Sequence, residues 1–126
     1  WGRIINIAST AGLKAYAYVS AYCTAKHGVI GLTRSVALET ANAGITVNAI
    51  CPGYTDTAIT DSAIENISLK TGRTKTEARE ELLKHNPQKR FIQPEEIANT
   101  VLWLCQQEAA SITGQTISIS GGEVMS

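Results

Sequence analysis

Aromatic residues are scarce in this sequence, and it carries no net charge. The chain has 126 residues, of which 44% are hydrophobic, 17% charged and only 6% aromatic, and its 11 basic residues balance its 11 acidic ones. Without a basic field it is poorly suited to nucleic-acid phosphates, so we expect no nucleic-acid partner. No apolar run approaches the ~20 residues that span a bilayer, so we also expect no membrane segment. The length fits one small domain.

The sequence also lacks the cysteine patterns of disulfide or metal sites. Cys23, Cys51 and Cys105 are odd in number and widely spaced, and neither a Cys-x-x-Cys pair nor a Cys/His cluster occurs. This favours buried free thiols in a reducing compartment, so we expect no metal and a cytoplasmic location. The chain begins with Trp1 and has no basic segment followed by an apolar one. We therefore expect no signal peptide and a sequence that is part of something longer.

Short apolar strands alternate with helices along the chain. Ser20 is predicted to cap the first helix, and Gly44 to end it. Pro94 and two following acids are typical of a helix start. We expect strands at residues 2–9, 45–51 and 115–120, and helices at 20–42, 77–84 and 94–105.

This alternation predicts right-handed crossovers and a parallel sheet. Three strands leave two open sheet edges, which a complete fold would not do. The predicted fold class is therefore α/β, with residues 1–126 forming a single partial domain, the C-terminal half of a doubly wound, parallel-sheet Rossmann-like fold. Residues 61–90 hold 12 of the 22 charged residues. We interpret this stretch as a solvated, mobile excursion.

Tyr22 and Lys26 are spaced i, i+4, which on a helix puts them on one face. A cation beside a phenol favours the phenolate, and such a phenol can exchange a proton with an alcohol near neutral pH. Ser9 ends the first strand, at the sheet edge where open α/β sheets bind ligands. The Tyr/Lys spacing alone also fits a tyrosine packed against a lysine stem on a surface helix.

With these neighbours, the sequence resembles the short-chain dehydrogenase/reductase family. The matching segments span nearly the whole chain in family order, and they are Arg3-Ile4-Ile5-Asn6-Ile7-Ala8-Ser9, Tyr22-Cys23-Thr24-Ala25-Lys26, Gly44-Ile45-Thr46-Val47-Asn48, Pro52-Gly53-Tyr54-Thr55-Asp56-Thr57, Thr113-Gly114-Gln115 and Gly121-Gly122. The resemblance implies an oxidoreductase that transfers hydride between NAD or NADP and a small-molecule substrate. It further implies a homotetramer.

The resemblance also implies roles for individual residues. Ser9 would orient the substrate oxygen, Tyr22 would be the general acid or base, and Lys26 would assist Tyr22 and bind the nicotinamide ribose. Tyr22 and Lys26 would thus both contact the cofactor.

Four further residues are implied to bind the cofactor. Pro52 and Gly53 would turn the backbone under the nicotinamide, while Thr55 and Thr57 would face its amide and the phosphates. Residues 58–90 would form a lid over the substrate, and the motion of such lids often limits turnover.

The branch of the family that the sequence resembles holds 3-oxoacyl thioester reductases and 3-hydroxybutyrate dehydrogenases. The latter bind a free carboxylate with a histidine and a lysine at the positions of Ala11 and Val19. A carboxylate without a cation in a closed pocket is costly. We therefore expect a 3-oxoacyl or 3-hydroxyacyl thioester of CoA or acyl carrier protein, with residues 15–19 lining its pocket. A 3-hydroxybutyrate dehydrogenase is the alternative.

The sequence departs from the family pattern in its missing first half. It has no glycine-rich turn between a strand and a helix, so Gly28, Gly31 and Gly44 cannot hold a dinucleotide. We expect the 126 residues alone to be inactive. A further alternative is a truncated, non-catalytic association module.

Overall fold

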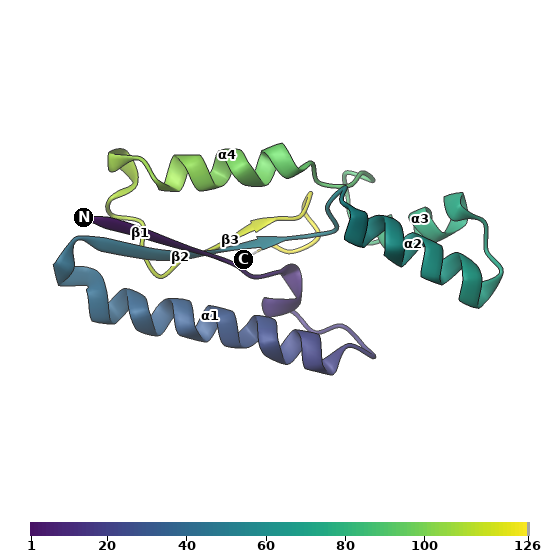
Figure 1. Ribbon diagram of the computed structural model, residues 1–126, viewed down its shortest axis with the longest axis horizontal. Coiled ribbons are helices and arrows are strands. Elements are labelled where there is room, and N and C mark those ends of the chain that lie inside the picture. Colours follow the sequence, from purple (N-terminus) through teal and green to yellow (C-terminus); the bar gives the residue numbers. More distant parts are fainter. Residues whose placement is uncertain (126) are drawn as a thin grey trace.

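The computed structural model describes residues 1–125, and a three-stranded parallel sheet lies at its centre. Its strands are β1 (Gly2–Ile7), β2 (Ile45–Pro52) and β3 (Thr116–Ile119), in the order β1-β2-β3. Helices α1 (Ser20–Thr40) and α4 (Pro94–Leu104) cover opposite faces of this sheet (Figure 1). The predicted α/β class and parallel sheet are confirmed.

Strand β2 is the most buried element because a strand flanks each of its edges and a helix covers each face. Every residue from Thr46 to Cys51 is buried. The one amide among them, Asn48, is fully paired: its Nδ2 donates to the Ile112 carbonyl (2.8 Å), and its Oδ1 accepts from the Gln115 amide (3.0 Å). A buried amide with both ends satisfied fixes the segment before β3 against β2.

Helix α1 begins and ends differently from the expectation. Ser20 is the first helical residue and not the cap, since Val19 occupies that position and its carbonyl already accepts from the Cys23 amide (2.9 Å). The helix ends at Thr40, and a 3-10 turn, Ala41–Ala43, replaces its expected last residues. Gly44 follows with φ +71°, so the glycine stop is confirmed.

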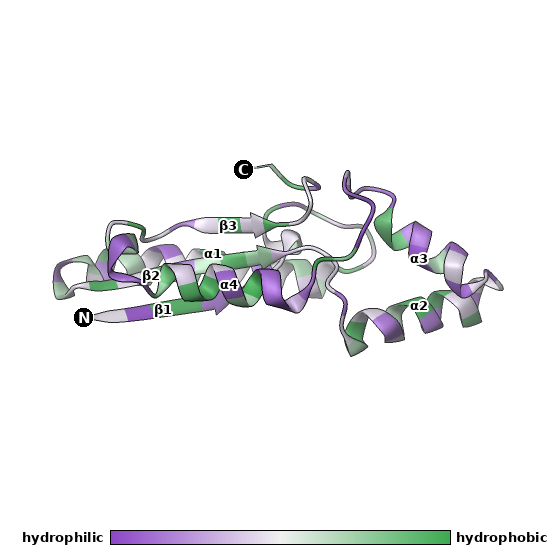
Figure 2. Cartoon of the chain, turned by 90° about the horizontal axis from the view of Figure 1, so that it is seen from above, coloured by the Kyte–Doolittle hydropathy of each residue, from purple (hydrophilic) through white to green (hydrophobic). Residues whose placement is uncertain are grey.

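Two helices project beyond the carboxyl ends of the strands, α2 (Ala58–Thr71) and α3 (Lys75–Leu83) (Figures 1 and 2). Only the second was predicted, at 77–84. Thr74 and Glu77 form a capping box at its start, with N–H···O distances of 3.1 and 3.2 Å. In α2 only Thr60 is buried, and Ala63, Ile64 and Ile67 follow it at helical spacing on a partly buried face.

The two ends of this projection are fastened together. The Ile92 amide donates to the Tyr54 carbonyl (2.9 Å), and the Asp56 amide donates to the Ile92 carbonyl (2.8 Å). The Arg79 guanidinium also lies 4.3 Å from the centroid of the buried Phe91 ring. Helices α2 and α3 are therefore carried on a short, hydrogen-bonded neck.

An ion pair joins the end of this neck to the start of α4. The Arg90 guanidinium donates two hydrogen bonds to Glu96 (2.8 and 2.9 Å), and the Gln93 amide donates a third (2.7 Å). These bonds, the pair to Arg90 foremost, lower the pKa of Glu96 to about 2. They place Glu96 in the first turn of α4, where an acid also favours the helix dipole.

None of the helices within residues 1–125 is long and apolar enough to cross a membrane. Over the same range, no group of three or more His, Cys, Asp and Glu side chains is placed to hold a metal ion. The three cysteines are free, and Cys23 and Cys51 are buried while Cys105 is partly exposed.

The Glu96 ion pair predicts a pH-dependent stability. Because its folded pKa is depressed, Glu96 stabilises the fold above its unfolded pKa near 4.5, and this contribution is lost as the pH falls towards 2. Glu96→Gln should therefore lower the midpoint of thermal unfolding at pH 7, by an amount that shrinks below pH 4.5. Glu95→Gln, at an exposed neighbouring carboxylate, is the control and should have a much smaller effect. A Glu96→Gln deficit that stays constant down to pH 2 would contradict this origin.

Candidate active site

Ser9 lies just beyond the carboxyl end of β1, in a position held by backbone pairing. The strand's ladder continues one residue further, since the Ala8 amide donates to the Ile50 carbonyl (2.7 Å). Ser9 then caps the 3-10 turn Thr10–Gly12, with its Oγ accepting from the Ala11 amide (3.1 Å). As an acceptor in that bond, Ser9 keeps its own hydroxyl proton for another partner.

Lys26 connects helix α1 to the end of β1. Its Nζ donates to the Ile7 carbonyl (3.2 Å) and lies 5.7 Å from the centroid of the Tyr22 ring, one helical turn earlier. The Tyr22 side chain is half exposed, and its hydroxyl has no hydrogen-bond partner within residues 1–125. The structure therefore brings the predicted Tyr22 and Lys26 together beside the strand end that carries Ser9.

The close approach of α1 to this strand end depends on Gly12. A Cβ on this residue would lie 2.8 Å from the Lys26 carbonyl oxygen and 2.8 Å from Ile30 Cδ1. The first of these is backbone, which cannot turn aside as a side chain can. The absence of a side chain at Gly12 is what lets the Lys26 turn of α1 rest on the loop that follows Ser9.

Cys51 lies beneath this cluster and does not join its chemistry. Burial raises the pKa of the Cys51 thiol, whereas a backbone hydrogen bond from Ser9 and the charges of Arg34 and Lys26 act in the opposite direction. A fully buried thiol with a raised pKa stays protonated and unreactive at neutral pH. Cys51 therefore serves as packing between the end of β2 and Ser9.

The predicted cofactor residues lie at the neighbouring strand end. Ile7 of β1 pairs with Ile50 of β2, so the segment after Pro52 leaves the sheet beside the segment that carries Ser9. The Gly53 amide donates to the Ile119 carbonyl (2.9 Å), and a Cβ at Gly53 would lie 3.3 Å from Ser120 Cα. Pro52 thus ends β2, and Gly53 directly after it is packed tightly against the residues after β3.

The two threonines that follow Gly53 in the segment before α2 differ in what their hydroxyls can do. Thr55 Oγ1 donates to the Gly53 carbonyl (3.0 Å), so its proton is used within this segment and only its lone pairs remain. Thr57 precedes α2, and its hydroxyl makes no capping bond to that helix. Thr57 therefore keeps both its donor and its acceptor capacity for a ligand.

A buried carboxylate that the sequence reasoning missed lies next to these residues. The Tyr16 hydroxyl donates to Glu123 Oε1 (3.0 Å) and also lies 3.0 Å from Thr10 Oγ1. Lys14 Nζ is 3.4 Å from the same Glu123 oxygen. Burial raises the pKa of Tyr16 to about 12, the Thr10 hydrogen bond lowers it, and the Glu123 carboxylate adds to the increase.

Tyr54 completes this part of the site. Burial raises the pKa of its phenol, and the nearby Glu123 and Tyr22 add to that increase. Tyr54 therefore lies within electrostatic reach of both the missed carboxylate and the predicted acid/base residue. The sequence held only one signal for Glu123: its partners Lys14 and Tyr16 lie between the predicted site residues Ser9 and Tyr22.

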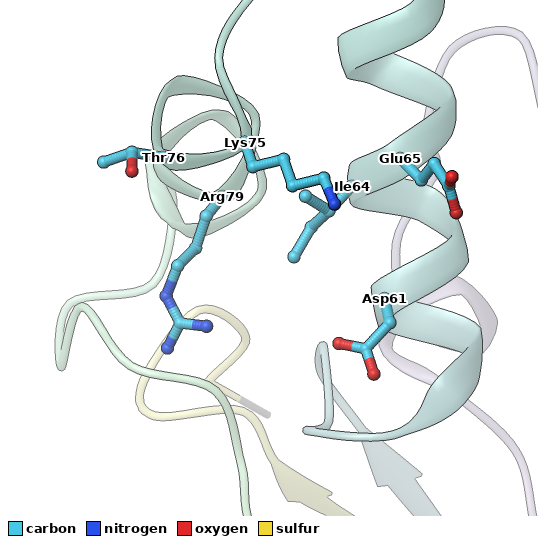
Figure 3. Close-up of a pocket in the computed structure, with 6 residues that line it drawn as sticks. All are labelled: Asp61, Ile64, Glu65, Lys75, Thr76 and Arg79. Atoms are coloured by element: carbon cyan, nitrogen blue, oxygen red, sulfur yellow. The ribbon is translucent and has the colours of Figure 1, made fainter.

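One cleft of the described residues lies away from Ser9, Tyr22 and Lys26. A cleft of about 360 Å³ separates α2 from α3, and Figure 3 shows the residues that line it, Asp61, Ile64, Glu65, Lys75, Thr76 and Arg79. Its acidic side chains come from α2 and its basic ones from α3, but no pair of them across the cleft is within salt-bridge distance in residues 1–125. Ser9, Tyr22 and Lys26 instead lie at an open edge of the sheet.

Comparison with known proteins agrees with this arrangement. A family model described as enoyl-(acyl carrier protein) reductase matches residues 1–123. The crystal structure titled as a short chain dehydrogenase family protein from Francisella tularensis superimposes with a TM-score of 0.92 at 32% identity, covering 96% of this chain and 50% of that one. The chain belongs to the short-chain dehydrogenase/reductase family.

Relatives within the short-chain dehydrogenase/reductase family carry several substrate names. D-beta-hydroxybutyrate dehydrogenase of Rhizobium meliloti is 48% identical over 97% of this chain and 48% of its own length. The 3-oxoacyl-(acyl-carrier-protein) reductase FabG of Rickettsia felis is 38% identical over 99% of this chain and 47% of its own. F189W actinorhodin polyketide ketoreductase, crystallised with NADPH, superimposes with a TM-score of 0.89 at 39% identity, covering 96% of this chain and 46% of that one. The chain spans about half the length of the curated relatives it matches.

The contact at Gly12 can be tested by substitution. Gly12→Ala should lower the free energy of unfolding by about 1–3 kcal/mol, because either the Lys26 turn of α1 or the loop after Ser9 must shift. The matched control is Gly28→Ala on α1, where a Cβ meets nothing within 4 Å. That change should leave stability unchanged or raise it by up to about 1 kcal/mol. Equal denaturant midpoints for the two variants would contradict the close approach.

Proposed function

We propose that the protein containing this chain transfers hydride between NAD or NADP and a 3-oxoacyl or 3-hydroxyacyl thioester. The observation that carries the proposal is the position of Lys26, whose ammonium bonds to the Ile7 carbonyl at the strand end and lies beside the Tyr22 ring. A surface tyrosine packed on a lysine stem would leave that ammonium in water and not on a strand carbonyl. Family membership supports the same assignment.

The residues present fit one end of a nicotinamide dinucleotide. An ammonium has three donors, and Lys26 uses one at Ile7, so two remain for ribose hydroxyls. Thr57 keeps a free hydroxyl at the start of α2, a helix end suited to phosphate. The bound cofactor would supply or accept the hydride.

Within this chain, the proton is handled by Tyr22 and the oxygen is held by Ser9. In the reducing direction the Tyr22 hydroxyl donates its proton to the substrate carbonyl oxygen, and in the oxidising direction it takes the alcohol proton back. Ser9 Oγ only accepts in its bond to Ala11, so its hydroxyl proton is free. Ser9 donates this proton in a hydrogen bond to the same substrate oxygen. The Lys26 ammonium lies 5.7 Å from the centroid of the Tyr22 ring and bonds to the strand end beside it.

The residues around this oxygen site favour an uncharged acyl group. Ala11 and Val19 offer no cation for a substrate carboxylate, and Ala11 is buried close to Ser9. A free carboxylate placed there would lose its hydration without gaining a partner. A thioester carbonyl carries no such cost, and residues 15–19 would line its acyl chain.

Helices α2 and α3 fit the role of a lid. Residues 58–90 begin directly after Thr57 and return at Arg90 through the hydrogen-bonded neck, so the segment stands over the carboxyl ends of the strands. A segment fastened only at its base can open for substrate and close over it.

A second candidate substrate is free 3-hydroxybutyrate. It is favoured by the 48% identity to a protein named D-beta-hydroxybutyrate dehydrogenase. The missing cations at Ala11 and Val19 weigh against it. A non-catalytic association module is a third reading, and intrinsic binding of a nicotinamide cofactor would exclude it.

The assignment of Tyr22 predicts the effect of removing one hydroxyl. Tyr22→Phe in the intact protein should lower kcat by about 10²–10⁴-fold, the usual contribution of a positioned acid or base, and leave cofactor affinity little changed. Turnover of 3-oxobutyryl-CoA followed at 340 nm gives kcat, and cofactor fluorescence gives the affinity. Full activity in Tyr22→Phe would overturn the proposed proton transfer.

The substrate assignment predicts a preference measured on the unmodified protein. We expect kcat/KM for 3-hydroxybutyryl-CoA to exceed that for free 3-hydroxybutyrate, because the acid brings an unpaired charge into the site. The same assay decides between the two candidate substrates. A clear preference for the free acid would overturn the thioester proposal and leave the roles of Ser9, Tyr22 and Lys26 standing.

A further inference from the structure

Glu123 is placed by a tight turn directly after β3. Gly121 and Gly122 both have positive φ angles, +63° and +90°, which residues with side chains rarely adopt. Ser120 closes the turn, since its Oγ accepts from the Val124 amide (3.1 Å) and its carbonyl accepts from the Glu123 amide (3.3 Å). The turn directs the Glu123 side chain inward, where only 6% of it is exposed.

The buried carboxylate of Glu123 meets two segments of the candidate site. On one side Oε1 bonds to the Tyr16 hydroxyl (3.0 Å) and pairs with Lys14 (3.4 Å), both in the loop between Ser9 and Tyr22. On the other side Oε2 lies 3.6 Å from where a Cβ of Gly53 would be. Glu123 therefore stands between the loop expected to line the acyl pocket and the turn expected to lie under the nicotinamide.

Lys14 directly precedes residues 15–19, which are expected to line the acyl pocket, and its partner cancels its charge. Its side chain is 38% exposed, so it can turn towards water or towards a bound ligand. A neutral pair offers a carboxylate ligand little attraction, whereas a free ammonium at the same place would attract it. The net charge that an entering acid meets therefore depends on Glu123.

We propose that Glu123 is a specificity-determining residue that neutralises Lys14 and so selects an uncharged acyl substrate over a free acid. It acts through Lys14 and touches no reacting atom, so it is a positioning residue. This inference rests on the proposed function for its substrate, and it adds a cause of the thioester preference that Ala11 and Val19 alone do not supply. Its consequence is that loss of one carboxylate charge opens the site to acids.

The test compares isosteric charged and neutral ligands in the intact protein. Calorimetry with butyrate and with butyramide, in the presence of cofactor, measures preference for charge without requiring turnover. We expect Glu123→Gln to tighten butyrate binding about fivefold, the size of a partly exposed ion pair, and to leave butyramide unchanged. A general loosening of the loop would instead weaken both ligands together.

Two further variants trace the effect to its source. The double variant Lys14→Met with Glu123→Gln should bind butyrate as weakly as the unmodified protein, because the freed cation is gone. Glu108→Gln, which removes an exposed carboxylate in the 3-10 turn Gln107–Ala109, should change neither ligand. The unmodified protein and all of these variants keep Lys26, so differences in their butyrate affinity report on Lys14.

The outcomes separate this inference from the proposed function. If Glu123→Gln does not fold, Glu123→Met carries the same test, because it removes the same charge and the 38% exposed Lys14 side chain can hydrate its freed ammonium. Unchanged butyrate binding in the folded variant would overturn the role of Glu123, as would a gain that survives in the double variant. A selective gain in butyrate binding by a protein with no activity towards either substrate would support Glu123 and overturn the proposed function instead.

Discussion

The hydrogen bond from the Lys26 ammonium to the Ile7 carbonyl joins a helix to a strand end, and the candidate site depends on it. It fixes the height of α1 along β1, and Tyr22, one turn earlier on the same helix, is positioned with it. Gly12 allows the approach, because no side chain there separates the Lys26 turn from the loop after Ser9. Parallel pairing of β1 with β2 then brings Pro52, at the end of β2, and Gly53 to the same edge.

Much of this arrangement is predictable from the sequence because the relevant signals are local or periodic. Buried parallel strands read as apolar runs, and Gly44 and Pro94 mark helix limits. The i, i+4 spacing of Tyr22 and Lys26 puts them on one face of the helix predicted over residues 20–42. The carboxyl-edge rule for open α/β sheets then places Ser9 beside them. These signals give the α/β class, the order of elements and the candidate proton-transfer pair.

The parts that escaped prediction depend on contacts between distant segments. Helix α2 was missed because exposed apolar side chains, Ile59 and Leu69, obscure its partly buried face of Ala63, Ile64 and Ile67. Ser20 looks like a cap, but the turn through Tyr18 and Val19 starts the helix one residue earlier. Glu123 is separated by more than a hundred residues from Tyr16 and Lys14. Only the folded chain shows that Glu123 neutralises Lys14 and accepts a hydrogen bond from Tyr16.

The most direct test of this account is a crystal structure of the intact protein with a nicotinamide cofactor and a 3-oxoacyl substrate analogue. The account predicts one substrate oxygen within hydrogen-bond distance, about 2.6–3.2 Å, of both the Tyr22 hydroxyl and Ser9 Oγ. It also predicts that Lys26 still contacts the Ile7 carbonyl while donating to the cofactor ribose. A substrate oxygen bound away from Tyr22 and Ser9, with Lys26 pointing into solvent, would contradict it.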